Sequence, residues 1–136
     1  MPGKSGKFGR FARLLLLIGV PLALPAAARA DINAFEFRLV ETEMKMGDAV
    51  IAVRIVNKST GKAVPDAVVF ARRLDMAPEG MRDMTAELNA LPPGEPGVYR
   101  FRANFTMDGD WQLSLAAKIQ GESGTLQARL GLKANK

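Results

Sequence analysis

The chain has 136 residues, a formal net charge of +5, and neither histidine nor cysteine. Without cysteine no disulfide or thiolate metal site can form, and without histidine there is no imidazole ligand or histidine base for a nucleophile. We therefore expect a protein that is not an enzyme. The thioethers of its seven methionines are the remaining soft metal ligands.

Residues 1–30 have the layout of a secretory signal peptide. Four basic residues precede Leu14, an apolar run extends from Leu14 to Leu24, and Ala28-Arg29-Ala30 supplies small residues at the spacing that a signal peptidase reads. This layout predicts cleavage before Asp31 and a protein that is periplasmic or secreted. A membrane span needs about twenty apolar residues. The run is shorter than that, and an uncleaved membrane anchor is the alternative.

The basic excess belongs to this leader. It holds five of the 19 basic residues and no acidic residue, so residues 31–136 carry 14 basic and 14 acidic side chains. A neutral domain without a basic stripe does not indicate a nucleic-acid partner. Contact with a membrane is expected only if the leader is retained. The acidic residues form no calcium-loop pattern and are expected to lie on a solvated surface.

Residues 31–136 are predicted to form one all-β domain. Apolar side chains alternate with polar ones in several runs, as in Tyr99, Phe101 and Phe105, and turn residues such as Asp108-Gly109 separate the runs. The expected strands are 32–41, 48–57, 66–74, 84–91, 97–106, 110–119 and 125–132. Seven short strands in about a hundred residues predict an immunoglobulin-like antiparallel β-sandwich. Trp111 is expected between its sheets.

The methionines of this domain occur in three connections of the predicted sandwich. Successive connections of an antiparallel sandwich alternate between its two ends, so the first, third and fifth share one end. These connections lie near 42–47, 75–83 and 107–109. The methionines in them or at their edges are Met44, Met46, Met76, Met81, Met84 and Met107.

Two roles are open for these side chains. Thioether sulfur is a soft, neutral ligand that suits Cu(I), whereas methionine is also a flexible filler of cores. Met76, Met81 and Met84 lie in a segment rich in proline, glycine and charged residues, where packing does not require apolar side chains, and they are the leading candidate ligands. Met44 and Met46 share a face by alternation, and Met107 extends a buried face. For these three, packing competes with metal binding.

Three segments resemble the YtkA-like and FixH-like family. They are Ala67-Val68-Val69-Phe70 followed by a Met-x-Pro-x-x-Met loop, then Pro96-Gly97-Val98-Tyr99-Arg100-Phe101, and then Met107-Asp108-Gly109-Asp110-Trp111-Gln112-Leu113. The resemblance extends from about residue 34 to 132. It implies a small exported or membrane-anchored immunoglobulin-like domain, associated with copper handling, heavy-metal efflux or assembly of copper-dependent respiratory enzymes. By this resemblance the FixH-like branch has a membrane anchor, so the soluble branch of the family fits a cleavable leader better.

By this resemblance, Met76, Met81 and Met84 correspond to the family's methionine-bearing loop. The absence of histidine there favours Cu(I) or Ag(I) over Cu(II). The leading hypothesis is a periplasmic Cu(I)/Ag(I) carrier or accessory domain that serves an efflux pump or a copper-enzyme assembly component. The alternative is a metal-free interaction module of the cell envelope whose methionine-rich surface contacts another protein.

The first testable prediction concerns cleavage of the leader. Because a signal peptidase would cut after Ala30, protein recovered from the envelope fraction should have the intact mass of a chain that starts at Asp31. Recovery of residues 1–30 on protein in the membrane pellet would instead establish the anchored form.

Overall fold

The computed structural model describes Gly19 and residues 31–136. The signal peptide predicted over residues 1–30 lies outside this part, apart from Gly19, and stays a prediction. The described residues form nine strands and two turns of 3₁₀ helix, and no helix among them is long and apolar enough to cross a membrane. The helical turns are η1 (Ile32–Ala34) and η2 (Ala77–Glu79). The strands are β1 (Phe35–Leu39), β2 (Glu43–Lys45), β3 (Gly47–Asn57), β4 (Val68–Met76), β5 (Met81–Ala86), β6 (Leu88–Ala90), β7 (Val98–Phe105), β8 (Gly109–Lys118) and β9 (Leu126–Asn135).

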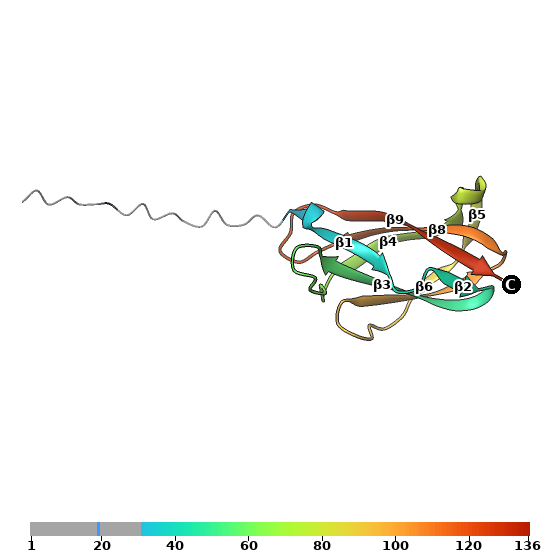
Figure 1. Ribbon diagram of the computed structural model, residues 1–136, viewed down its shortest axis with the longest axis horizontal. Coiled ribbons are helices and arrows are strands. Elements are labelled where there is room, and N and C mark those ends of the chain that lie inside the picture. Colours follow the sequence, from blue (N-terminus) through green and yellow to red (C-terminus); the bar gives the residue numbers. More distant parts are fainter. Residues whose placement is uncertain (1–18, 20–30) are drawn as a thin grey trace, which may run out of the picture.

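The strands form two sheets that pack face to face (Figure 1). The four-stranded sheet has the order β1-β3-β7-β6, and the five-stranded sheet has the order β2-β9-β8-β4-β5. Neighbouring strands are antiparallel, except that β2 runs parallel to β9. This architecture confirms the predicted all-β, immunoglobulin-like sandwich.

The core lies between the sheets and follows the predicted alternation. On β7 the buried side chains are Phe101, Ala103 and Phe105, and on β8 they include Trp111 and Leu113. The indole of Trp111 is fully buried, and its ring meets Phe105 edge-on with centroids 5.5 Å apart. Because β7 and β8 belong to different sheets, this contact joins the two layers, as predicted for Trp111.

The prediction of one strand over 84–91 is wrong. The chain forms β5 in the five-stranded sheet, passes through Glu87 and then forms β6 in the four-stranded sheet. Met84, Ala86 and Leu88 all pack against the core. Both sheets face that core, so the alternation continues unchanged across the switch and the sequence pattern does not reveal it.

A second difference is β2, which lies within the predicted connection 42–47. It pairs with the end of β9, with Met44 opposite Ala134. This pairing carries β9 on to Asn135, beyond its predicted end at residue 132. Three residues are too short for an alternation pattern, so the sequence did not indicate this strand.

Tyr99 ties down the segment before β4. Its hydroxyl donates to the carbonyl oxygen of Val64 at 2.8 Å and accepts from the backbone N–H of Ala67 at 2.9 Å. Burial raises the pKa of this phenol above its ordinary value. Gly97 has a φ of 83°, and a Cβ there would lie 2.5 Å from that of Ala63, so only glycine fits this approach.

Replacing Trp111 by alanine should lower the free energy of unfolding by about 3–5 kcal/mol, because a large buried ring is removed. Urea denaturation monitored by circular dichroism measures this loss. Val50→Ala is the control: Val50 is 44% exposed, and its truncation should change stability by no more than about 0.5 kcal/mol. Equal stability of the Trp111→Ala variant and the parent would contradict the buried packing.

Candidate functional site

The three methionine-bearing connections meet at one end of the sandwich, at the right in Figure 1, as predicted. Met44 on β2 lies opposite Ala134, which lies opposite Gly109 at the start of β8. The N–H of Met46 donates to the carbonyl oxygen of Asn135 at 2.7 Å. We call this end, with its six methionines, the methionine pole.

A hairpin between β4 and β5 carries three of the six, and we call residues 76–84 the methionine hairpin. Pro78 lies in the first turn of η2, where a backbone N–H would have no partner within the helix, so its missing N–H costs nothing. Gly80 ends the turn at a φ of 75°. The N–H of Gly80 donates to the carbonyl oxygen of Ala77 at 2.9 Å. This local chemistry reverses the chain and sets Met76 directly opposite Met81.

The methionine hairpin is docked onto the start of β8. A carboxylate oxygen of Glu79 accepts from the backbone N–H of Asp110 at 2.9 Å. A Cβ on Gly109 would lie 3.0 Å from the Cε of Met76 and 3.1 Å from the Oε1 of Glu79. Gly109 has a φ of 130°, so both its backbone and the close packing favour glycine.

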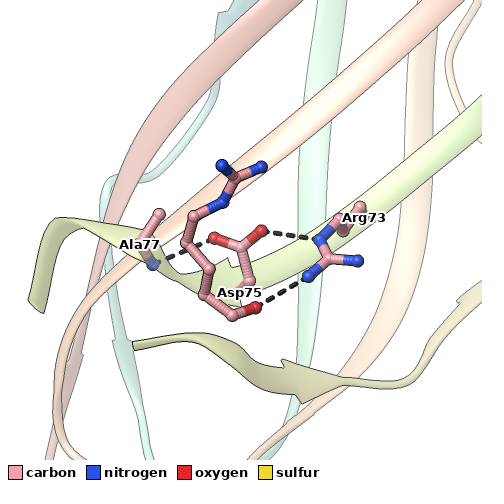
Figure 2. Close-up of polar contacts among 4 residues, drawn as sticks. Arg73, Asp75 and Ala77 are labelled. Atoms are coloured by element: carbon pink, nitrogen blue, oxygen red, sulfur yellow. Dashed lines mark hydrogen bonds and ion pairs between the residues drawn. The ribbon is translucent and has the colours of Figure 1, made fainter. Parts of the chain in front are cut away.

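Asp75 braces the start of the hairpin through Ala77 and Arg73 (Figure 2). Its Oδ1 accepts from the N–H of Ala77 at 3.0 Å, and its Oδ2 accepts from the Nε of Arg73 at 2.8 Å. Arg73 also donates from Nη2 to the carbonyl oxygen of Arg82 at 2.7 Å. One ion pair therefore connects β4 with both sides of the methionine hairpin.

The pKa of Asp75 is held below its ordinary value of 3.8. Burial of the carboxylate acts to raise this pKa, but the bond and charge of Arg73 and the N–H of Ala77 together outweigh that effect. The side chain of Asp75 is almost wholly buried, at 2% exposure for the residue. The expectation that the acidic residues lie on a solvated surface is therefore wrong for Asp75.

Sequence reasoning missed Asp75 and Glu79 as supports of the hairpin. Asp75 lies between the buried residues Leu74 and Met76, so strand alternation places it on the outer face, where solvent was expected. The hairpin itself covers that position. The spacing Arg73-x-Asp75 on one strand face was the available signal, since side chains two residues apart on a strand are neighbours.

The six thioethers differ in access to solvent. Met81 and Met46 are 37% and 38% exposed, whereas Met76 and Met44 are buried at 1% and 8%. Met84 and Met107 are partly buried and pack against the core. Met81 and Met46 are therefore the thioethers most accessible from solvent.

The prediction that Met44 and Met46 share a face is wrong. Met44 is buried in β2, and Met46 is exposed at the bend where the chain leaves the five-stranded sheet for β3 in the other sheet. Gly47 has a φ of 91°, which breaks the alternation at this point.

The structure brings some candidate ligands together and separates others. Met76 and Met81 are direct neighbours across the hairpin, and Met76 packs on Gly109, two residues from Met107. Met44 lies on β2, which β9 and β8 separate from β4. Three strand spacings amount to about 14 Å, so Met44 is the more distant candidate. Among residues 31–136, histidine, cysteine, aspartate and glutamate form no group of three that could hold a metal ion.

The fold and the site together define a small immunoglobulin-like domain with methionines gathered at one end. The YtkA-like family model matches residues 29–116, which is more than half of the chain. The protein belongs to the YtkA-like family. This confirms the YtkA-like part of the resemblance, and the FixH-like part stays a prediction.

No curated protein matches the chain. Among solved structures, the crystal structure of the Lin-41 filamin domain matches with 17% sequence identity and a TM-score of 0.45. That match covers 73% of this chain and 91% of the filamin domain.

The Asp75 ion pair predicts a pH-dependent stability. A carboxyl whose pKa is lowered on folding stabilises the protein above its unfolded pKa, and this contribution is lost as the pH falls through the folded pKa. Asp75→Asn should therefore lower the free energy of unfolding by about 1–3 kcal/mol at pH 7. Below pH 3.8 the difference from the parent should shrink.

Urea denaturation at several pH values tests this. Asp83→Asn is the control, because Asp83 is an exposed carboxylate of the same hairpin. A constant difference between Asp75→Asn and the parent across the acid range would show that the charge of Asp75 does not matter.

Proposed function

We propose that this protein is an exported Cu(I)- or Ag(I)-binding domain that uses methionine thioethers and acts as a carrier or accessory domain. The observation that carries the proposal is the pairing of exposed Met81 with buried Met76 across the methionine hairpin. Met84 is the third proposed ligand on the hairpin. Met107, Met46 and, at greater distance, Met44 are the additional candidates.

The chemistry of the methionine pole favours the binding of a soft monovalent ion. Thioethers are neutral and soft, so they favour Cu(I) or Ag(I) over zinc, magnesium and calcium. They need no deprotonation, and binding should therefore vary little with pH wherever the fold is intact. An exposed first ligand such as Met81 suits an ion that is exchanged with another protein rather than stored.

The remaining parts of the proposal follow from this role. A domain that binds and transfers an ion needs no catalytic group, so we propose no enzymatic activity. A cleaved leader would place the domain in the periplasm or outside the cell. Its partner there would be a component of heavy-metal efflux or of copper-enzyme assembly, classes that the family resemblance suggests.

A metal-free interaction module is the second candidate. The burial of Met76 and Met44 favours it, because both side chains already serve the core. In this alternative, exposed Met46 and Met81 form an adaptable apolar contact for another envelope protein. Metal titration separates the two candidates.

Substituting Met76, Met81 and Met84 together by leucine should abolish Cu(I) binding while the fold is kept. Leucine conserves most of the volume and apolar character of methionine but has no sulfur ligand. A competition titration against a chromophoric Cu(I) chelator under reducing conditions measures binding, and circular dichroism measures folding.

Two single variants make a matched pair for the same titration. Met81→Leu and Met46→Leu change the same chemistry at sites with 37% and 38% exposure. Met81→Leu should weaken Cu(I) binding at least about tenfold, a change of about 1.4 kcal/mol, and Met46→Leu should weaken it less. The copper proposal is wrong if the parent binds no Cu(I), or if the triple variant binds it as the parent does.

A further inference from the structure

A polar pocket lies on the outer face of the five-stranded sheet, beside the methionine hairpin. It has a volume of about 590 Å³. The lining residues that matter here are Arg73, Asp75, Arg82, Gln112, Ser114 and Arg129. They come from β4, the hairpin, β8 and β9, so the pocket spans three neighbouring strands.

Strand register places one arginine on each side of a small residue. Ser114 on β8 lies opposite Arg73 on β4 and opposite Arg129 on β9. Next to this row, Gln112 lies opposite Asp75 and Gly131. The short side chain of Ser114 leaves the middle of the face low between Arg73 and Arg129. The backbones that carry Arg73 and Arg129 are two strand spacings apart, about 10 Å.

The charge of the pocket is not balanced by its own residues. Asp75 is the one carboxylate among the lining residues, and Arg73 already pairs with it. Within residues 31–136, the ion pairs are Arg73–Asp75 and Arg38–Glu36, so Arg82 and Arg129 have no carboxylate within 4.0 Å there. With three arginines and one carboxylate, the pocket has two positive charges in excess.

Arg73 is also held in place before any ligand arrives. Its Nε and Nη2 donate to Asp75 and to the carbonyl oxygen of Arg82. A guanidinium has five N–H donors, so further donors remain. A guanidinium fixed in this way loses less conformational entropy on binding than a free one.

We propose that this pocket binds an acidic segment of a partner protein through at least two carboxylates. Guanidinium groups match carboxylates in geometry and can bind them bidentately. The three arginines of the pocket come from β4, the hairpin and β9, so the several carboxylates of an extended acidic segment can meet more of them than one small oxyanion can. Arg82 belongs to both the pocket and the methionine hairpin, so a segment bound here would bring its protein beside Met81.

Binding of an acetylated, amidated hexaglutamate peptide tests the inference in the absence of copper. Nuclear magnetic resonance titration should shift the backbone amides of Gln112, Ser114 and Arg129 more than those of the four-stranded sheet. The affinity should fall as sodium chloride is raised, because exposed ion pairs are screened by salt.

The test variant is Arg82→Gln with Arg129→Gln, which leaves the Arg73–Asp75 pair intact. It should bind hexaglutamate at least about tenfold more weakly than the parent. The matched control is Arg54→Gln with Arg102→Gln, which removes the same charge from exposed positions of the four-stranded sheet. Its affinity should stay within about twofold of the parent.

The outcomes separate this inference from the copper proposal. The variant with Met76, Met81 and Met84 replaced by leucine should still bind hexaglutamate, since the pocket needs no metal. Equal binding by the Arg82/Arg129 variant and the parent would overturn the inference, as would an equal loss in the control. If succinate binds as tightly as hexaglutamate, the pocket takes a small carboxylate and the partner segment is refuted.

Discussion

The buried indole of Trp111 is the contact on which the methionine pole depends. Its ring packs edge-on against Phe105 of the opposite sheet, and its Nε1 donates to the carbonyl oxygen of Met107 at 3.1 Å. One side chain therefore joins the two sheets and fixes the turn between β7 and β8. Because Gly109 and Asp110 follow this turn, the same contact positions the backbone on which the methionine hairpin docks.

Polar bonds hold the methionine hairpin at its start and at its turn, in addition to the packing of Met76 and Met84 on the core. Glu79 binds the backbone of β8, and Asp75 binds both Arg73 and the first residue of η2. These contacts orient the hairpin without using the thioether of Met81, which stays accessible. The contacts that support the hairpin therefore leave Met81 accessible, as the proposed metal site or protein contact requires.

Methionine suits a pole that is part of the core and also, in the proposed function, a binding surface. Met76 is buried against Gly109, while Met81 directly opposite it is exposed. A ligand that engages both side chains would connect the surface to the core and stabilise the folded domain. The outer pocket around Arg82 and Arg129 lies beside the same hairpin, which places an apolar and a basic surface next to each other.

Much of the fold followed from the sequence alone. The alternation of Tyr99, Phe101 and Phe105 and the turn at Asp108-Gly109 defined strands whose inward faces do not depend on distant partners. The gathering of the methionine connections at one end also followed, because it depends only on consecutive strands running in opposite directions.

Other features were decided by tertiary structure. The switch between sheets at Glu87 was hidden, because both sheets bury the same alternating side chains. The burial of Asp75 and the exposure of Met46 depend on what covers each residue: a hairpin folds over Asp75, and a bend turns Met46 outward. Strand periodicity tells which face a side chain occupies, whereas only packing between distant segments decides whether that face is covered.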